Sequence, residues 1–241
     1  MQKSEIPEQK VLLHRLGRIP YAEAWKFQEY LFDNLIREKV ERRNLNTGFS
    51  DPVHHLILCS HPPVYTLGKS ANPANLLLHE DLIRSQGAEI FKTNRGGDIT
   101  FHGPGQLVVY PIFDLDFFFT DIHRYLRTLE ESVILTLASY GINADRYPGY
   151  TGVWIQPENE QKARKICAMG VRCSRWVTMH GLAFNLNTDL QWFNHIVPCG
   201  ISDKKVSSLH LETGKTIDEE ETADLLVKNM AMLFNFILKK L

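Results

Sequence analysis

A cysteine in an unusual setting is the first residue of this sequence that could do covalent chemistry. Cys199 lies in the run Ile196-Val197-Pro198-Cys199-Gly200-Ile201. Most free cysteines are small, buried apolar residues, but Pro198 stiffens the chain before this thiol and Gly200 permits unusual backbone angles or a close approach of substrate. The flanking residues therefore favour a nucleophile. The other three cysteines lie in apolar, strand-like runs and are predicted to be core residues (Cys59, Cys167 and Cys173).

A thiol needs a partner to react at neutral pH, because a free cysteine with a pKa of about 8.5 is only a few per cent thiolate there. An ammonium about 4 Å away contributes on the order of 4 kcal/mol at an effective dielectric near 20. Desolvation takes back part of this, so the thiol pKa should fall by about one to three pH units. Lys165, in the segment Lys165-Ile166-Cys167-Ala168-Met169-Gly170-Val171-Arg172, is the candidate. A single lysine is ordinarily a solvated surface residue, as expected for Lys162 and Lys205, and only the surrounding segment singles Lys165 out.

A glycine-rich stretch, 95–106, could hold a ligand against its backbone. Its small and rigid residues let N–H groups face a ligand and let the chain approach it closely (Gly96, Gly97, Gly103, Pro104 and Gly105). A Gly-Pro-Gly run alone would indicate a turn between strands. Polar side chains in the same loop favour a binding wall instead (Arg95, Thr100, His102 and Gln106). The stretch matches neither the Walker pattern nor GxGxxG, which disfavours nucleotide binding.

Several histidines lie close together in the sequence, but their spacing does not support a metal site. The cluster His54, His55, Cys59 and His61 fits no zinc signature, and in a strand His55 and Cys59 would share one face while His54 points to the other. We therefore predict no metal site. His102 and His180 are better candidates for a site, as hydrogen-bond donors or as part of its wall, whereas His123 and His210 are predicted to lie on the surface.

Composition limits the classes of function that remain. The chain has 241 residues, 44% hydrophobic and 23% charged, with a net charge of -1. It is typical of an ordinary globular protein, and it gives no electrostatic argument for nucleic acid or an anionic membrane as a partner. The absence of a CxxC pair indicates a reducing cytoplasm. No apolar leader follows Met1, and no apolar run approaches the roughly 20 residues of a membrane span.

The elements that must position these residues follow from periodicity and turn residues. Helices are predicted over 21–43, from Thr120-Asp121 to a C′ glycine at Gly141, and from Thr216 onward. The last has Glu219 at capping-box spacing and an apolar stripe (Leu225, Leu226, Met230, Leu233 and Ile237). Strands are predicted over 53–59, 64–67, 89–92 and 107–112, with further short strands from 143 to 186. Helices on a mostly mixed sheet give one α/β or α+β domain spanning 1–241.

Taken together, these motifs resemble the lipoyl(octanoyl) transferases, the octanoyl-carrier-protein to protein N-octanoyltransferases of lipoate synthesis. The resemblance covers about residues 20–238, and the separation of Lys165 and Cys199 agrees with it. Four motifs carry it: Arg95-Gly96-Gly97 with Thr100 and His102-Gly103-Pro104-Gly105-Gln106; Lys165 with Ala168-Met169-Gly170-Val171-Arg172; Trp176-Val177-Thr178-Met179-His180-Gly181-Leu182-Ala183; and Pro198-Cys199-Gly200. Asp98 is a departure, since many members have Gln there. The implied fold is that of biotin and lipoate protein ligases, a large mixed sheet and a smaller one flanked by helices.

The resemblance implies a mechanism in two transfers. Cys199 attacks the thioester of octanoyl-acyl carrier protein, and a lysine of an apo lipoyl domain then takes the octanoyl group as an amide. Lys165 lowers the thiol pKa and could shuttle the proton. The implied acceptors are the lipoyl domains of 2-oxoacid dehydrogenase complexes and the glycine cleavage H protein. The implied acyl pocket is lined by Arg95, Gly96, Gly97, Asp98, Ile99, Thr100, Phe101, His102, Ala168, Met169, Gly170, Gly181, Leu182 and Ala183.

The energetics agree with a reaction that needs no cofactor. Exchange between thioesters is close to balanced and the step from thioester to amide runs downhill, so no ATP is required. Three alternatives remain open. An ATP-dependent lipoate or biotin ligase would not need Cys199. An amidotransferase would move the acyl group between two proteins through a related cysteine. A non-catalytic acyl-binding protein would keep the glycine-rich wall without needing both Lys165 and Cys199.

Overall fold

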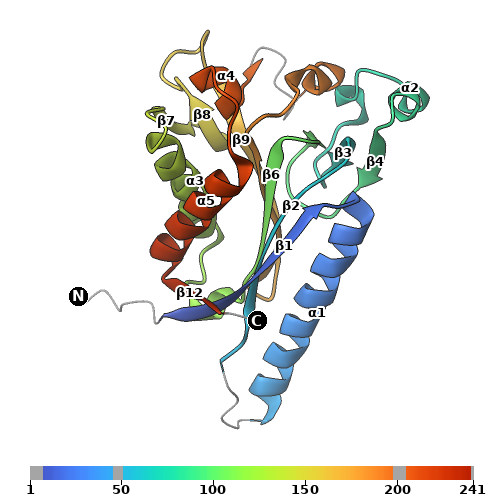
Figure 1. Ribbon diagram of the computed structural model, residues 1–241. Coiled ribbons are helices and arrows are strands. Elements are labelled where there is room, and N and C mark those ends of the chain that lie inside the picture. The colour runs from blue at the N-terminus through green and yellow to red at the C-terminus, as the bar shows by residue number, and fades with distance from the viewer. Residues whose placement is uncertain (1–7, 46–50, 198–204, 240–241) are drawn as a thin grey trace.

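Two sheets and the helices that cover them make up the computed structural model, which describes residues 8–45, 51–197 and 205–239 (Figure 1). The large sheet has the strand order β12 (Phe236–Lys239), β1 (Gln9–Arg18), β2 (His54–Ser60), β6 (Gln106–Ile112), β10 (Val177–Asn185), β9 (Arg164–Ser174), β8 (Tyr150–Ile155) and β7 (Ala144–Tyr147), and β11 (Lys205–Val206) also pairs with β9. The small sheet has the order β4 (Glu89–Lys92), β3 (Val64–Leu67) and β5 (Ile99–His102). Parallel and antiparallel pairs occur in both sheets, so the predicted mixed sheets are confirmed.

Helices cover both faces of the large sheet. The α-helices are α1 (Tyr21–Leu45), α2 (Glu80–Ser85), α3 (Ile122–Ala138), α4 (Leu209–Thr213) and α5 (Glu219–Phe234), and the short 3-10 helices are η1 (Pro73–Asn75), η2 (Leu115–Phe117) and η3 (Leu190–His195). Figure 1 shows α1 on one side of the large sheet and α3 with α5 on the other. Strands such as β2 and β6 are therefore buried on both faces and are almost continuously apolar.

The long helix α1 forms because its buried residues repeat at helical spacing. They occupy positions 21, 24, 28, 31, 32, 35 and 39, which is one stripe facing the sheet. Two members of this stripe are polar, and both have partners. Gln28 accepts the backbone N–H of His180 through Oε1 at 3.0 Å. Lys39 is paired with Asp114 at 2.5 Å and with Asp116 at 2.8 Å. The helix is thus fixed to β10 and to the chain after β6.

The small sheet carries its own apolar cluster, which receives η3. Phe101 of β5 stacks on Trp192 with ring centroids 5.4 Å apart, and it meets Phe193 edge-on. The hydroxyl of Tyr65, on β3, donates to the carbonyl of Trp192 at 2.7 Å. Ile196, which follows η3, belongs to the same apolar cluster.

Several predicted elements are confirmed and others need correction. The helix predicted over 21–43 is α1, and β3 and β4 have the predicted bounds. The capping box at Thr216 is wrong: Asp218 caps α5 by accepting the N–H groups of Glu220 and Glu221, both at 3.0 Å. Ile237 is not in the final helix. Asn235 ends that helix in the left-handed conformation, with φ 55°, and Ile237 pairs with Lys10 in β12.

Two smaller points complete the comparison with the expected elements. Gly141 does have a positive φ of 73°, but α3 ends at Ala138 with Ser139 as its C-cap, so Gly141 lies one position beyond the C′ site. The strands β1, β5 and β12 and the helices α2 and α4 were not predicted from the sequence. None of the helices in the described ranges is both long and apolar enough to cross a membrane.

Candidate active site

A cavity lies where the small sheet meets strands β9 and β10 of the large sheet. It encloses about 530 Å³ of unfilled space, part of it open to solvent. Its lining residues are Tyr21, Arg95, Gly97, Asp98, Ile99, Thr100, His102, Tyr110, Ala168, Met169, Gly170, His180, Gly181, Leu182 and Ala183. Most of these come from the glycine-rich stretch, from the middle of β9 and from β10, and Tyr21 of α1 and Tyr110 of β6 add to them, so segments far apart in sequence share one cavity.

The floor of the cavity is open because small residues face each other across two paired strands. In the β9–β10 ladder, Gly170 is opposite Gly181 and Ala168 is opposite Ala183. A Cβ atom on Gly170 would lie 2.7 Å from the carbonyl oxygen of Gly96, and one on Gly181 would lie 2.1 Å from that of Val109. Both distances are shorter than a Cβ can tolerate. Glycine is therefore needed here for close backbone approach as well as for space.

Arg95 fastens the glycine-rich loop rather than reaching into the cavity as an unpaired charge. Its guanidinium donates to Thr66 Oγ1 at 3.1 Å, to the Thr66 carbonyl at 2.6 Å and to the Asp98 carbonyl at 2.7 Å. Nη1 also donates to the Gly96 carbonyl at 3.0 Å. The planar fork of donors suits such a set of acceptors. The loop 95–98 is held to β3 in this way, and the Gly96 N–H donates to the Val171 carbonyl of β9 at 2.9 Å.

His102 belongs to a buried chain of hydrogen bonds that runs away from the cavity. Its Nδ1 donates to Gln106 Oε1 at 2.8 Å, and Gln106 Nε2 donates to Asn185 Oδ1 at 2.9 Å. Asn185 Nδ2 in turn donates to the Ser207 carbonyl at 2.9 Å. Burial lowers the pKa of His102 to about 3. His102 is thus a neutral part of the wall, linked to the chain that follows residue 204.

His180 lines the cavity from an unusual backbone conformation. Its φ is +58° in the middle of a strand, a region that costs a non-glycine residue on the order of 1–3 kcal/mol. The N–H is held by Gln28, and Nε2 donates to Asn94 Oδ1 at 2.7 Å. Burial lowers the pKa of His180 to about 3, so this ring is also neutral.

Lys165 is buried beside the cavity, with 7% of its surface exposed. It lines a second, smaller cavity that shares Ile99, Thr100, Ala168 and Ala183 with the first. Its Nζ lies 4.8 Å from the ring centroid of Trp154, within the range of a cation–π contact. By contrast Lys162 and Lys205 are exposed, as predicted. The sequence could not show this burial, because a lysine in a strand-like run reads as a surface residue.

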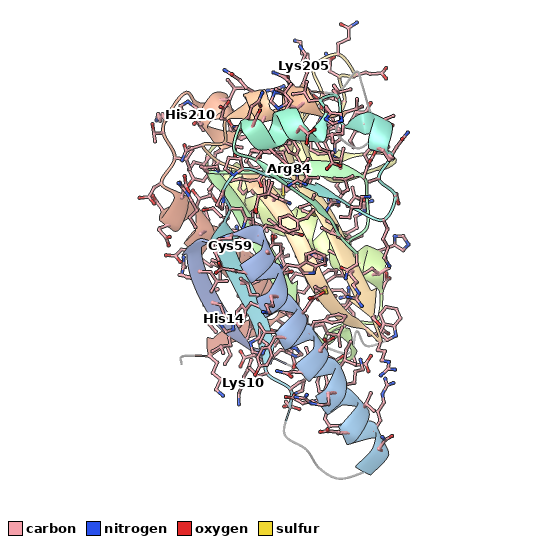
Figure 2. The ribbon with its side chains drawn as sticks, turned by 90° about the vertical axis from the view of Figure 1, so that its right-hand side faces the viewer. Lys10, His14, Cys59, Arg84, Lys205 and His210 are labelled. Atoms are coloured by element: carbon pink, nitrogen blue, oxygen red, sulfur yellow. The ribbon has the colours of Figure 1, made fainter. Side chains whose placement is uncertain are left out.

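Cys199 lies in 198–204, outside the described residues, but the chain on both sides of that segment is anchored. The Val197 N–H donates to the Asn75 carbonyl at 2.8 Å. On the other side, Lys205 and Val206 form β11 against Arg164 and Lys165. Figure 2 places Lys205 toward the same end of the molecule as Arg84 of α2, far from Lys10 and His14.

The remaining cysteines are poor nucleophiles. Cys59 and Cys167 are buried, as predicted, and burial raises the pKa of each thiol far above its usual value. The prediction that Cys173 is buried is wrong: it is exposed near the β9–β10 hairpin. Partial burial of its thiol still raises the pKa of Cys173. None of these three thiols is disposed to ionise at neutral pH.

The histidines of the rejected metal cluster each have a separate partner. His54 Nδ1 accepts the Asp114 N–H at 3.2 Å, His55 contacts His14 at 3.0 Å, and His61 accepts from the Tyr110 hydroxyl at 2.8 Å. Within the described ranges, no group of three or more His, Cys, Asp or Glu side chains could hold a metal ion.

The structure gathers the residues expected to line an acyl pocket around one cavity, with two exceptions. Gly96 contacts β9 instead, and the Phe101 ring packs in the core against Trp192. Tyr21 and Tyr110 line the cavity without having been predicted. Each sits in a regular apolar pattern, the first of α1 and the second of β6, so no sequence signal separates it from a core residue. Most of the surface that lines this cavity is apolar, which suits an apolar ligand.

Both the sequence and the fold of this chain are similar to those of known proteins. The family model of the lipoyl protein ligase A/B catalytic domain matches residues 20–231. An octanoyltransferase of Cytophaga hutchinsonii is 53% identical over 93% of this chain and 92% of its own length. One of Flavobacterium johnsoniae is 51% identical over 93% and 97%. Among solved structures, the bipartite lipoate protein ligase of Thermoplasma acidophilum is 16% identical with a TM-score of 0.67, covering 97% of this chain and 86% of that one. That likeness shows the fold.

Proposed function

Because the chain belongs to the family of the lipoyl protein ligase A/B catalytic domain, we propose that it transfers an octanoyl group from acyl carrier protein to the lysine of a lipoyl domain. Relatives that share about half of its sequence are octanoyltransferases, which makes it an acyltransferase. The observation that carries the proposal is the position of Lys165, a buried ammonium at the edge of an apolar cavity. A general apolar binding site would have no use for that charge.

In the first step the Cys199 thiolate attacks the carbonyl carbon of the octanoyl thioester. The new carbon–sulfur bond forms as the bond to the carrier sulfur breaks, and the carrier leaves as a thiol after taking up a proton. Lys165 would stabilise the thiolate before the attack and is a suitable source of that proton. An ammonium about 4 Å from the thiolate is worth on the order of 4 kcal/mol at an effective dielectric near 20, before desolvation.

In the second step the amine of the acceptor lysine attacks the octanoyl-cysteine thioester. The carbon–nitrogen bond forms, the carbon–sulfur bond breaks, and the amine loses a proton as the amide is made. Cys199 is regenerated as a thiol. The overall exchange of a thioester for an amide runs downhill, so no ATP enters the balance.

The cavity would hold the acyl chain during both steps. Its walls offer paired small residues on β9 and β10, while His102 and His180 are neutral, so no charge lies against the chain from these histidines. Each methylene buried contributes about 0.8 kcal/mol. The wall residues would thus select and retain the chain, while the charged group at the cavity edge acts on the thiol.

The lipoyl domains of 2-oxoacid dehydrogenase complexes and the glycine cleavage H protein belong to the same proposal as acceptors. The lipoate ligase that is similar in fold belongs to a lipoylation system with its own E2 lipoyl domain, which supports an acceptor of this kind. A cytoplasmic location fits as well, because Cys199 has to remain a reduced thiol.

Mass spectrometry with defined donors tests the proposal. The protein is mixed with octanoyl-acyl carrier protein and the adduct is mapped by peptide. One octanoyl group on Cys199, passed on to an added lipoyl domain, is the expected result. A product formed only from octanoate and ATP, with no adduct on the protein, would identify a ligase instead. An adduct formed from an octanoylated lipoyl domain but not from the carrier protein would identify an amidotransferase.

A further inference from the structure

Asp98 lies on the cavity wall, yet its carboxylate is directed at another part of the chain. Oδ1 accepts the N–H of Ile99 at 2.8 Å and the N–H of Asn72 at 3.1 Å. Oδ2 accepts the side-chain amide of Asn75. Both carboxylate oxygens are therefore engaged, and two of the three donors come from the turn at 72–75. A charged acceptor makes stronger hydrogen bonds than a neutral one.

The turn that Asp98 holds is itself bonded to the chain that leads to Cys199. The carbonyl of Asn75 accepts the Val197 N–H at 2.8 Å, and the Leu77 N–H donates to the His195 carbonyl at 2.9 Å. Between these two bonds, Leu76 and Ile196 form an antiparallel bridge. Val197 is the last described residue before the segment that carries the cysteine. Asp98, Asn75 and Val197 thus form one continuous connection from the cavity wall to that segment.

A direct role of Asp98 in holding the acyl chain fits these contacts poorly. A carboxylate placed against a buried apolar chain would lose its water without gaining a partner, which is costly. Here its partners are the backbone N–H groups of Ile99 and Asn72 and the side-chain amide of Asn75. The side chain is better suited to fixing the position of a backbone segment than to binding an apolar ligand.

We propose that Asp98 is a positioning residue for the acyl transfer: by holding the 72–75 turn through Asn75, it sets the position of Val197 and thereby the approach of the Cys199 thiol to its substrate. This role rests on the function proposed above, in which Cys199 is acylated. It predicts that the contact between residues 98 and 75 controls the rate of acylation, whichever of the two residues supplies the negative charge.

Exchange of the two side chains tests that contact. Asp98→Asn exchanges the charged acceptor for an amide, whose contact with Asn75 is neutral and therefore weaker, and Asn75→Asp places two carboxylates face to face. Each should lower the single-turnover rate of Cys199 acylation by octanoyl-acyl carrier protein about tenfold, at saturating donor, with less than a twofold change in the donor concentration for half-saturation. The double variant with Asp98→Asn and Asn75→Asp restores one donor and one acceptor, and it should recover the rate to within about threefold of the wild type.

A matched control separates positioning from general loss of stability. Asp218 also accepts two backbone N–H groups through its carboxylate, but at the start of α5. Asp218→Ala should lower the thermal midpoint and leave the acylation rate unchanged. Peptide-resolved alkylation of Cys199 by iodoacetamide over a range of pH adds a readout that does not need the acyl cavity. Its midpoint should rise in both single variants and return in the double variant.

The results of these experiments distinguish a failure of the role of Asp98 from a failure of the proposed function. Wild-type acylation rates in both single variants, no recovery in the double variant, or an effect confined to the donor concentration for half-saturation would each overturn the role of Asp98 while leaving the proposed function intact. A wild-type protein that forms no octanoyl adduct at all would overturn the proposed function, and the role of Asp98 with it.

Discussion

The Ser207 N–H donates to the carbonyl oxygen of Lys165 at 2.8 Å. This bond ties the chain after residue 204 to the residue whose ammonium lies at the cavity edge. The Ser207 carbonyl is held by Asn185, and its hydroxyl donates to Glu212, which is paired with Arg164. The described chain is thus anchored before residue 198 by the bond of Val197 to Asn75, and after residue 204 by the bond of Ser207 to Lys165.

Replacement of the proposed nucleophile should abolish transfer without unfolding the protein. In Cys199→Ala the covalent carrier is lost, so we expect transfer to fall below a tenth of the wild-type rate, a barrier increase of more than about 1.4 kcal/mol. The rate of octanoyl transfer to a lipoyl domain measures it. Cys173→Ser is the matched control, since that cysteine is exposed and away from the cavity, and it should retain full activity. Octanoyl transfer by the alanine variant above a tenth of the wild-type rate would contradict the covalent mechanism.

Removal of the buried ammonium should make the thiol harder to ionise. Lys165→Ala is expected to raise the Cys199 pKa by about one to three pH units, because the attraction between ammonium and thiolate is lost. Acylation at neutral pH should slow in proportion to the lost thiolate. The pH dependence of iodoacetamide alkylation at Cys199 gives the pKa. Lys162→Ala removes an exposed lysine three residues away and should leave the midpoint where it is; an unchanged midpoint in the Lys165 variant would show that another group activates the thiol.

Elements with a repeating apolar pattern could be predicted from the sequence. Element ends that depend on one residue could not. The stripe of α1 repeats over about five turns, so its helix was clear. The start of α5 depended on which of two capping residues is used, and the carboxylate of Asp218 took the place expected for Thr216. Strand β1 was missed because Gln9 and Arg15 lie on the same face as Val11 and Leu13 and interrupt its apolar alternation. Hydrogen bonds to β2 and β12 stabilise the strand despite this weak pattern.

The sequence indicated which residue types form the candidate site, but it predicted only in part which residues meet at the cavity. The resemblance implied that Gly170 and Gly181 line one pocket, and the structure shows them opposite each other on β9 and β10. Tyr21 and Tyr110 were not predictable, since nothing in a helix or strand pattern says which apolar residue meets a cavity. Asp98 was visible in the sequence as a departure from the resembling family, but its partners Asn72 and Asn75 become neighbours only after folding.

Acyl chain length should show an optimum near eight carbons if the cavity is closed at its inner end. Burying two more methylenes contributes roughly 1.6 kcal/mol between six and eight carbons, or about fifteenfold. Longer chains would then be penalised by overpacking, typically by about 1–3 kcal/mol. Single-turnover acylation by hexanoyl-, octanoyl-, decanoyl- and palmitoyl-carrier protein measures the profile. Equal rates for palmitoyl and octanoyl donors would mean an open-ended cavity and would remove the octanoyl assignment.

As the pH falls, this protein should begin to lose stability at a higher pH than protonation of its carboxylates alone would cause. Burial lowers the pKa of His54, His102 and His180 to about 3 each, against about 6.5 in an unfolded chain. Between these values the unfolded chain binds more protons than the folded one. The stabilising contribution of these neutral histidines is therefore complete above pH 6.5 and is lost progressively as the pH falls toward 3, at up to about 1.4 kcal/mol per pH unit for each.

His54→Asn isolates one of these contributions. The Asn Oδ1 can still accept the Asp114 N–H, so the hydrogen bond is kept while the titrating ring is removed. Burial raises the pKa of Asp114 itself. The comparison is therefore made at pH 5.5 and above, nearer to the range in which the histidines of the unfolded chain titrate. Urea unfolding at pH 7.0, 6.25 and 5.5 should show a free energy of unfolding that falls less steeply with acidification in the variant than in the wild type. His123→Asn, at an exposed position, should keep the wild-type slope. A wild-type slope in His54→Asn would show that His54 takes up a proton in the folded state as readily as in the unfolded one.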